Sequence, residues 1–365
     1  EVELRLSVGG RLDGYDSYED TIVAASPEPL PDRVAGFDML YSSGTTGRPK
    51  GVLPSLERQP LEEAGTAVAG LCALLLGVTE DTVYLSPAPL YHAAPLRFCM
   101  AQGVLGGTVV VMEHFDPEEF LAQIEQRKVT TTQVVPTMFV RMLKLPDEVR
   151  ARYDVSSITS VVHAAAPCPV DVKRRMIEWW GPVVHEYYAG TEGNGFVYCN
   201  SEQWLEHPGT VGQAIVGTIH IVGDDGEEVT VGEEGTVYFE GGGTFEYHGD
   251  PDKTADSRLA NGWSTLGDVG RLDEEGFLYL TDRKAYMIIT GGVNVDPQEA
   301  ENLLTMHPAV ADVAVIGVPD DDFGEAVKGV VQPVEMPADD EAAAALSREL
   351  IAYCREHLAD VKCPR

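Results

Sequence analysis

The first half of the chain alternates apolar, β-rich runs with helical patterns, and this alternation constrains the fold more than any other feature. The run TVVVM at residues 108–112 is typical of a strand. Residues 116–119 (DPEE) then provide a helix N-cap, a proline and acidic side chains for a first helical turn. Further strands are predicted at residues 160–163 and 183–188. Strands that alternate with helices favour a parallel sheet covered by helices, with the chemistry on the loops at the strand ends.

The second half of the chain has a different texture. From about residue 208, short alternating segments are separated by glycine-rich turns, which predicts a β-rich part that is either barrel-like or a small packed sheet. Beyond it, Asp296 caps a predicted helix, and the apolar run at residues 310–318 predicts a buried strand. An amphipathic helix then carries Leu346, Leu350 and Cys354 on one stripe, with Ile351 and Leu358 beside it. We therefore expect an α/β protein with a large N-terminal domain (1–283, with an α/β part at 1–207 and a β-rich part at 208–283) and a small α+β C-terminal domain (284–365).

Charge and composition exclude several classes of protein. The 26 Lys and Arg against 59 Asp and Glu give a net charge of −33, and such a surface repels nucleic acids and anionic membranes. The longest uncharged stretch, residues 64–79, is shorter than the ~20 apolar residues that a membrane span requires, so we interpret it as a buried helix. The six cysteines show no CxxC spacing, which favours reduced thiols and a cytoplasmic location. We expect no nucleic-acid partner and no integral membrane segment, and a homodimer is left open.

A loop rich in glycine and hydroxyl groups follows a short apolar run. Residues 41–51 read YSSGTTGRPKG, in which glycines can turn backbone N–H groups toward an anion and Lys50 adds a positive charge. The pattern suits a polyphosphate. It is not a Walker A loop, because Pro49 stands where that motif has its second glycine. On composition alone, a plain flexible loop explains the segment about as well as a phosphate-binding one.

The sequence of this loop resembles the signature of the adenylate-forming superfamily, which includes acyl-CoA synthetases, nonribosomal adenylation domains and luciferases. Five later segments resemble further signatures of that superfamily in the expected order. They are PLYHAAP (89–95), HAAAPCP (163–169), EYYAGTEG (186–193), GWSTLGDVG (262–270) and DRKAYMIITGGVNVDPQE (282–299). The resemblance covers nearly the whole chain and favours the acyl-CoA synthetase branch.

The resemblance implies a nucleotide site. Tyr188 is the expected platform for adenine, Asp268 the carboxylate that accepts both ribose hydroxyls, and Glu192 an oxygen ligand for Mg²⁺. The implied catalytic residues are Thr191, Glu192 and Lys50. The implied nucleotide-binding residues are Ser42, Ser43, Gly44, Thr45, Thr46, Gly47, Lys50, Ala165, Ala166, Pro167, Tyr188, Thr191, Asp268 and Arg283.

The resemblance also implies an acyl pocket and a site for coenzyme A. The acyl pocket would contain His92, Ala164, Tyr188, Ala189 and Gly190, with His92 at its mouth and Ala164 to Ala166 on a strand of small residues. A buried structural histidine is the alternative for His92, and His163 and His185 are interpreted as structural. Gly291 and Gly292 would line the CoA tunnel. The resemblance also implies that the small α+β C-terminal domain is mobile, with Ala285 at its hinge, where the superfamily usually has Asp or Lys.

Compared with the superfamily, the sequence looks truncated at both ends. Only about forty residues precede the phosphate loop, and the chain stops at Arg365, before the superfamily's adenylation lysine. That lysine therefore cannot be assigned to a residue of this sequence.

The activity implied is ATP-dependent formation of an acyl-adenylate from a carboxylic acid, followed by transfer of the acyl group to CoA, as in fatty acid metabolism. Amino-acid-activating relatives place an Asp near residues 91–94, whereas no acidic residue occurs between Thr82 and Gly107, so a neutral acid is favoured. Three alternatives stay open: loading of a carrier protein, nucleotide binding without catalysis, and luciferase-like oxygenation.

Overall fold

The structure is a computed structural model of the chain. It describes residues 4–42, 50–55, 59–61, 66–283, 288–290, 293–320 and 323–365, without the side chains of Ser42, Asp282, Arg283 and Asn294. The chain divides into two compact units, residues 1–37 with 56–64 and residues 38–55 with 65–365. In the first unit, β1 (Leu6–Ser7) pairs in parallel with β2 (Asp16–Ser17), and α1 (Tyr18–Ala24) follows.

The second unit contains a seven-stranded sheet, in the order β11-β10-β9-β8-β7-β5-β6. The five strands from β5 to β9 are parallel, as the alternating pattern predicts, whereas β10 and β11 are antiparallel. The bounds are β5 (Val83–Ser86), β6 (Thr108–Val111), β7 (Thr131–Val134), β8 (Ser160–His163), β9 (Val184–Tyr188), β10 (Phe196–Cys199) and β11 (Gln213–Val216).

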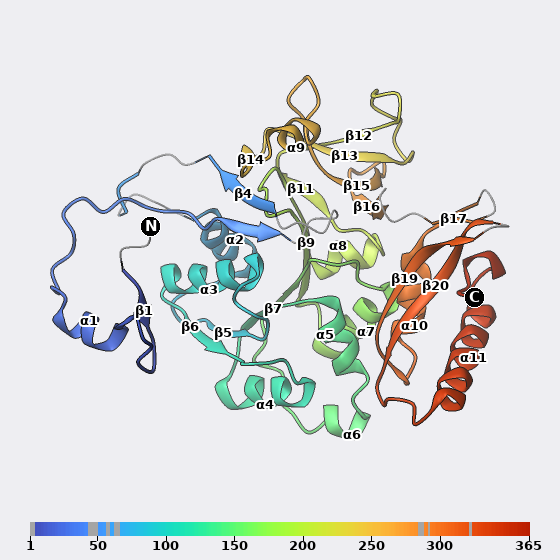
Figure 1. Cartoon of the computed structure of the whole chain (residues 1–365), viewed down its shortest axis with the longest axis horizontal. Helices are drawn as coiled ribbons and strands as arrows, with labels where there is room; N and C mark the ends of the chain where they lie inside the picture. Colours follow the sequence, from blue (N-terminus) through green and yellow to red (C-terminus); the bar gives the residue numbers. More distant parts are fainter. Residues whose placement is uncertain are drawn as a thin grey trace. The chain divides into compact units, whose positions relative to one another are not determined.

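Helices cover both faces of this sheet (Figure 1). Side chains of α4, α5 and α7 pack with Leu85 and Val161 on one face, and those of α2 and α3 pack with Tyr84 and Val162 on the other. Asp116 caps α4 and accepts from two first-turn N–H groups, which confirms the predicted start of this helix. The helices are α2 (Ala67–Leu76), α3 (Ala93–Leu105), α4 (Pro117–Arg127), α5 (Pro136–Leu143), α6 (Asp147–Arg150), α7 (Val170–Trp180) and α8 (Ser201–Glu206).

The prediction of a buried helix at residues 64–79 is only partly right. Cys72 is buried, but Leu74 is 81% exposed. The helix packs on the sheet through one side only. Because its sequence is apolar on all sides, the sequence does not show which side chains are buried. No helix in the part of the chain that the structure describes is both long and apolar enough to cross a membrane.

The β-rich part consists of two open sheets, a half-barrel in place of a closed barrel. The first has the order β12-β13-β15-β16, and the second has the order β14-β4-β3. Two of its strands precede residue 208, because the segment around Lys50 pairs with β14. The elements are β3 (Leu40–Ser42), β4 (Lys50–Pro54), β12 (Thr218–Val222), β13 (Gly235–Glu240), β14 (Phe245–Tyr247), α9 (Pro251–Asp256), β15 (Ser264–Leu272) and β16 (Leu278–Arg283).

The small C-terminal domain has a four-stranded sheet, in the order β18-β17-β20-β19, and its own apolar core (Figure 1, orange to red). Asp296 caps α10, and Leu350 and Cys354 of α11 are buried, both as predicted. Its elements are β17 (Ile288–Thr290), β18 (Val293–Val295), α10 (Pro297–Thr305), β19 (Val310–Asp320), β20 (Gly324–Pro333), α11 (Asp340–His357) and the 3-10 helix η1 (Asp360–Lys362).

Residues 310–318 form the predicted strand as part of β19, but the prediction that this strand is buried is only partly right. Val310 and Val315 are buried, but Ile316 is 45% exposed. The strand forms a long ribbon with β20 that buries only one of its two faces, so alternate apolar side chains of β19 remain in contact with solvent.

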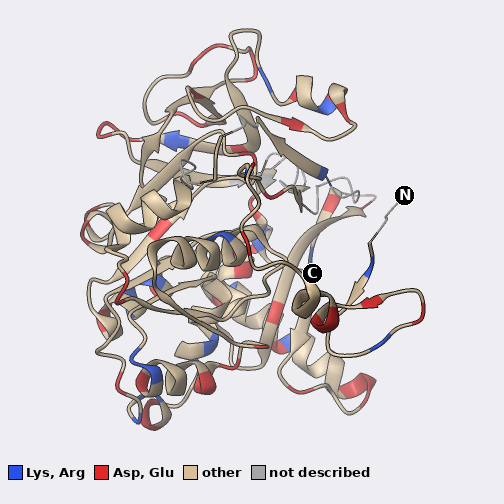
Figure 2. Ribbon diagram, turned by 90° about the vertical axis from the view of Figure 1, so that its left-hand side faces the viewer, with Lys and Arg blue, Asp and Glu red and all other residues tan. Residues whose placement is uncertain are grey.

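Lys144, at the end of α5, joins the large domain to the small one. Its ammonium donates hydrogen bonds to the backbone carbonyls of His307 (3.0 Å) and Val310 (2.6 Å). Burial lowers the pKa of Lys144. Away from this contact, acidic side chains are spread over many loops and helix ends (Figure 2).

Candidate functional site

The loops that follow β8 and β9 begin side by side, because the two strands are parallel neighbours. Ala164, Ala165 and Ala166 lie in the loop after β8, so the prediction that they form a strand is wrong. Ala165 has a φ of 76° in the left-handed region, which costs about 1 kcal/mol or more for a residue other than glycine. Strain of this kind is concentrated at functional sites. Pro167 follows in the same loop.

Tyr188 and Asp268, the residues expected at adenine and ribose, are in contact. The Tyr188 hydroxyl donates a hydrogen bond of 2.6 Å to Oδ2 of Asp268, although the two residues are 80 positions apart in sequence. Tyr188 ends β9, Asp268 lies on β15 and is 6% exposed, and the Tyr188 ring is tilted against Phe239. Arg283 stands opposite Asp268 in the β15–β16 register. The structure therefore brings Tyr188 and Asp268 into contact and places the backbone of Arg283 opposite Asp268.

Glu192 and Lys50 meet at a third residue, Tyr247. The Tyr247 hydroxyl donates a 2.9 Å hydrogen bond to Oε1 of Glu192. The Lys50 ammonium lies 5.1 Å from the centre of the Tyr247 ring. Tyr247 is not among the residues predicted from the sequence, since nothing in its local pattern relates it to a loop 55 residues earlier.

Gly190 leaves room for the Glu192 carboxylate. A Cβ at Gly190 would lie 2.6 Å from Leu266 and 2.7 Å from Oε2 of Glu192. Ala189 and Thr191 flank this glycine in the same loop after β9. A side chain at position 190 would therefore displace either Leu266 or the carboxylate.

His92 is exposed, so the alternative of a buried structural histidine is wrong for this residue. It precedes α3 as the N-cap residue, and its ring is tilted against Tyr91 at 4.5 Å.

Several predicted residues lie outside the described part of the chain, so nothing is said of their arrangement. They are Ser43, Gly44, Thr45, Thr46, Gly47, Ala285, Gly291 and Gly292, together with the side chains of Ser42 and Arg283.

A buried ion pair lies beneath the two loops. Lys173 of α7 is 2.5 Å from Glu186 of β9, and the two side chains are 0% and 6% exposed. Burial raises the pKa of Glu186, against the opposing effect of the Lys173 charge. His163 of β8 is fully buried next to this pair, and burial holds its pKa well below the usual range, so its ring is neutral. The pair ties α7 to β9 two residues before Tyr188.

The donor set around Glu192 fits Mg²⁺ that arrives with a nucleotide. Mg²⁺ is usually bound by one or two carboxylates together with substrate phosphates and water. Among the described residues, no group of three or more His, Cys, Asp or Glu side chains could hold a metal ion by itself. Glu192 therefore fits a shared ion better than a resident metal.

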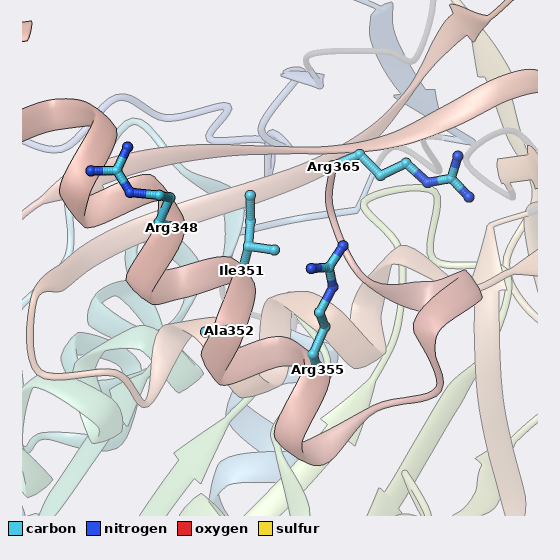
Figure 3. A pocket seen from close by; sticks show the side chains of 5 residues that line it. All are labelled: Arg348, Ile351, Ala352, Arg355 and Arg365. Atoms are coloured by element: carbon cyan, nitrogen blue, oxygen red, sulfur yellow. The ribbon is translucent and has the colours of Figure 1, made fainter. Parts of the chain in front are cut away.

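A separate hollow of about 670 Å³ lies on the small domain. Figure 3 shows the guanidinium groups of its arginines pointing in different directions. Arg355 is 3.3 Å from Asp360, and Arg365 lies over the Phe323 ring. The hollow is lined by Arg348, Ile351, Ala352, Arg355 and Arg365. None of the residues described above at the Tyr188 and Glu192 loops lines it.

The fold consists of a large α/β domain with a half-barrel, followed by a small C-terminal domain. Together with the residues expected at a nucleotide, Tyr188, Asp268 and Glu192, it defines an adenylate-forming enzyme. Two family models match the chain: AMP-binding enzyme over residues 8–247, and AMP-binding enzyme C-terminal domain over residues 299–365. The chain belongs to the AMP-binding enzyme family and is an adenylate-forming ligase.

Individual relatives support this assignment. Feruloyl-CoA synthase of Amycolatopsis sp is 34% identical over 352 residues, which are 94% of this chain and 68% of the relative. The amide bond synthetase McbA from Marinactinospora thermotolerans has a TM-score of 0.76 at 31% identity over 100% of this chain and 71% of its own. The o-succinylbenzoate CoA synthetase (MenE) from Bacillus subtilis, solved with ATP and a magnesium ion, has a TM-score of 0.70 at 31% identity, covering 89% and 64%. The chain spans about two thirds of the length of these relatives.

Proposed function

We propose that this protein activates a neutral organic acid with ATP and transfers the acyl group to coenzyme A. The observation that carries the proposal is that Tyr188 and Asp268 meet at one end of β9, while Glu192 follows in the next turn of the same chain segment. Similarity to a feruloyl-CoA synthase and an o-succinylbenzoate CoA synthetase favours a CoA ligase. The cytoplasmic location expected from the cysteines is part of the proposal.

In the first step, a carboxylate oxygen of the acid attacks the α-phosphorus of ATP. A carbon-bound oxygen forms the new P–O bond, the bond to the β-phosphate breaks, and pyrophosphate leaves. The Tyr188 ring faces the adenine, and Asp268 accepts the ribose hydroxyls in exchange for the hydroxyl of Tyr188. Glu192 would hold Mg²⁺, which neutralises phosphate charge when it is bound, and the Thr191 hydroxyl would donate a hydrogen bond to the α-phosphate. Lys50 adds positive charge on the same side.

In the second step, the CoA thiol attacks the acyl carbon of the adenylate. A C–S bond forms, the C–O bond to AMP breaks, and the thiol proton goes to solvent. The two glycines at 291 and 292 are proposed to line the tunnel for the thiol, and Ala285 is proposed as the hinge of the small domain.

The acid is proposed to be uncharged apart from its carboxylate. The support is that no acidic side chain occurs from Thr82 to Gly107, which includes His92 and the whole of α3. A cationic substrate group buried there would lack a partner, and an unpaired buried charge is costly. A fatty or aromatic acid avoids this cost.

Amide bond formation is the second candidate function. It is favoured by the similarity to McbA, which extends over the whole chain. The acyl-adenylate would be the same, and an amine would replace the thiol as the attacking group. A carrier-protein thiol would likewise replace CoA.

A substrate panel tests these proposals on the full-length protein. Fatty, aromatic and alicyclic acids are each incubated with Mg²⁺ and ATP, and then with CoA, a simple amine, or neither. We expect pyrophosphate release with at least one acid and an acyl-CoA as the product. Amide without acyl-CoA would replace the first proposal by the second, and no pyrophosphate with any acid would overturn both.

Glu192→Gln tests the role of the carboxylate. We expect pyrophosphate release to fall by roughly 100-fold or more. The reason is that Mg²⁺, which stabilises the negative charge of the transition state, loses a charged ligand. The matched control is Glu246→Gln, which removes an exposed carboxylate from β14 next to Tyr247 and should leave the rate unchanged. A near-wild-type rate in folded Glu192→Gln would contradict the assignment.

Asp268→Ala tests nucleotide recognition. Hydrogen bonds to charged groups are worth about 1.5–3 kcal/mol, so ATP and AMP should bind about 10- to 150-fold more weakly. Affinity for the free acid should change little. Calorimetry with both ligands decides this, and equal losses for acid and nucleotide would point to a damaged fold.

A further inference from the structure

We propose that Tyr247 is a positioning residue whose hydroxyl orients the Glu192 carboxylate toward Mg²⁺-bound nucleotide. The inference rests on the proposed function of Glu192 as a magnesium ligand. It adds a residue from the half-barrel that the sequence analysis did not associate with the site. Tyr247 is not proposed to touch the reacting atoms.

The position of Tyr247 is fixed by its surroundings. On β14 it pairs with Val52 of β4, and its side chain is 7% exposed. The backbone N–H of Tyr247 donates to the hydroxyl of Thr254, and its carbonyl accepts from the N–H of Asp250. The ring packs edge-on against Phe245 at 5.3 Å. The hydroxyl is therefore presented from a strand that is held on both sides.

The Glu192 loop is tied to the same segment of chain. Gly193 donates its N–H to the carbonyl of Gly190, which closes a tight turn, and the N–H of Gly243 donates to the carbonyl of Gly193. A Cβ at Gly242 would lie 1.8 Å from the carbonyl oxygen of Asn194, so the two backbones approach closely. The segment before β14 thus holds the loop, and Tyr247 holds its carboxylate.

The hydrogen bond gives the two oxygens of the Glu192 carboxylate different surroundings. Oε1 accepts from the Tyr247 hydroxyl at 2.9 Å. Oε2 lies over Gly190, where no Cβ interferes. A carboxylate oriented at one oxygen binds a metal at the other with less loss of freedom, as partners of metal ligands generally ensure. The Lys50 ammonium also lies 5.1 Å from the centre of the Tyr247 ring. The Tyr247 side chain therefore contacts both charged residues that are proposed to act on the phosphates, Glu192 and Lys50.

Tyr247→Phe is the direct test, because it keeps the ring and removes only the hydroxyl. The readout is the affinity of Mg²⁺ for the full-length protein saturated with a non-hydrolysable ATP analogue, measured by calorimetry. We expect Mg²⁺ to bind about tenfold more weakly, the equivalent of one hydrogen bond to a charged group. Affinity for AMP without Mg²⁺ should stay the same.

Tyr198→Phe is the matched control. Its hydroxyl makes a 2.6 Å contact with Nδ1 of His185, on the strand next to β9 and away from Glu192. This variant should leave Mg²⁺ affinity at the wild-type value. If both variants weaken Mg²⁺ binding equally, the effect comes from the loss of a buried hydrogen bond in general, and the proposal is overturned.

A double variant shows whether Tyr247 acts through Glu192. Glu192→Ala alone should weaken Mg²⁺ binding, and adding Tyr247→Phe should cause no further loss. Additive losses, or an unchanged affinity in Tyr247→Phe, would overturn the proposal. The result is independent of the acyl acceptor, because no acid or CoA is present. Failure to find a substrate acid would therefore count against the proposed function and not against Tyr247.

Discussion

The large and the small domain each contain a lysine–glutamate pair, and the two pairs differ in burial. In the large domain, the Lys173–Glu186 pair is almost fully buried beneath the loops after β8 and β9. In the small domain, Lys362 pairs with Glu299 where the side chains are 31% and 43% exposed. Buried charges are costly and gain little stability over an apolar substitute. Their presence next to the end of β9, two residues before Tyr188, indicates that the large domain holds β9 and α7 in a fixed arrangement at the expense of stability.

Removing one partner of the buried pair should have the largest effect. Lys173→Met would leave Glu186 without its partner and should lower the free energy of unfolding by about 3–5 kcal/mol. Urea denaturation measures this. The double variant Lys173→Met/Glu186→Gln should recover much of the loss, because no unpaired charge remains. A loss below about 1 kcal/mol in the single variant would remove the contrast between the domains.

Acid should destabilise the large domain through His185. Burial, with a further contribution from Lys173, lowers the pKa of His185 from 6.5 to about 4. Between these two values the unfolded chain binds more protons than the folded one, so the free energy of unfolding falls as the pH falls. The loss should be about 2 kcal/mol at pH 5.

Comparison of urea unfolding at pH 7.5 and pH 5.0 tests this. The wild type should lose about 2 kcal/mol more between the two pH values than His185→Gln does. His357→Gln, which replaces an exposed histidine of the small domain, should behave like the wild type. Identical pH dependence in all three proteins would contradict the prediction.

Removing the contact between the two domains should have an intermediate effect on the free energy of unfolding. Lys144→Met removes two hydrogen bonds to carbonyls of the small domain and should cost about 1–2 kcal/mol in free energy of unfolding. The control is Lys128→Met, whose ammonium makes an exposed pair with Asp154 and should matter by less than about 0.5 kcal/mol. Equal losses would show that the position of Lys144 between the domains has no special energetic role.

The exposed pair of the small domain should have the smallest effect. Lys362→Ala should lower the free energy of unfolding by about 0.3–1 kcal/mol, even though both Glu299 oxygens are within 2.7 Å of its ammonium. In 1 M NaCl the difference should nearly vanish, because salt screens exposed charges. A salt-independent loss above about 2 kcal/mol would mean that this pair behaves like the buried one.

The elements predicted correctly are those that local sequence decides. The cap at Asp116, the parallel strands and the stripe of Leu350 and Cys354 depend on neighbours within one or two turns or within one strand. Burial was predicted less well. The exposed Leu74 of α2 and Ile316 of β19 are apolar, but what covers a residue depends on segments far away in the sequence.

The site divides in the same way. The sequence by itself determined the family, since motifs in the expected order contain the residues that bind a nucleotide. It also determined the parallel sheet, since hydrophobic periodicity is a local property of the sequence. Only the tertiary structure decided that the Tyr188 hydroxyl meets Asp268, that Tyr247 meets Glu192, and that Lys173 lies buried under β9. The physical reason is that hydrogen bonds and burial act over a few ångströms in space, between residues that are 80, 55 and 13 positions apart along the chain.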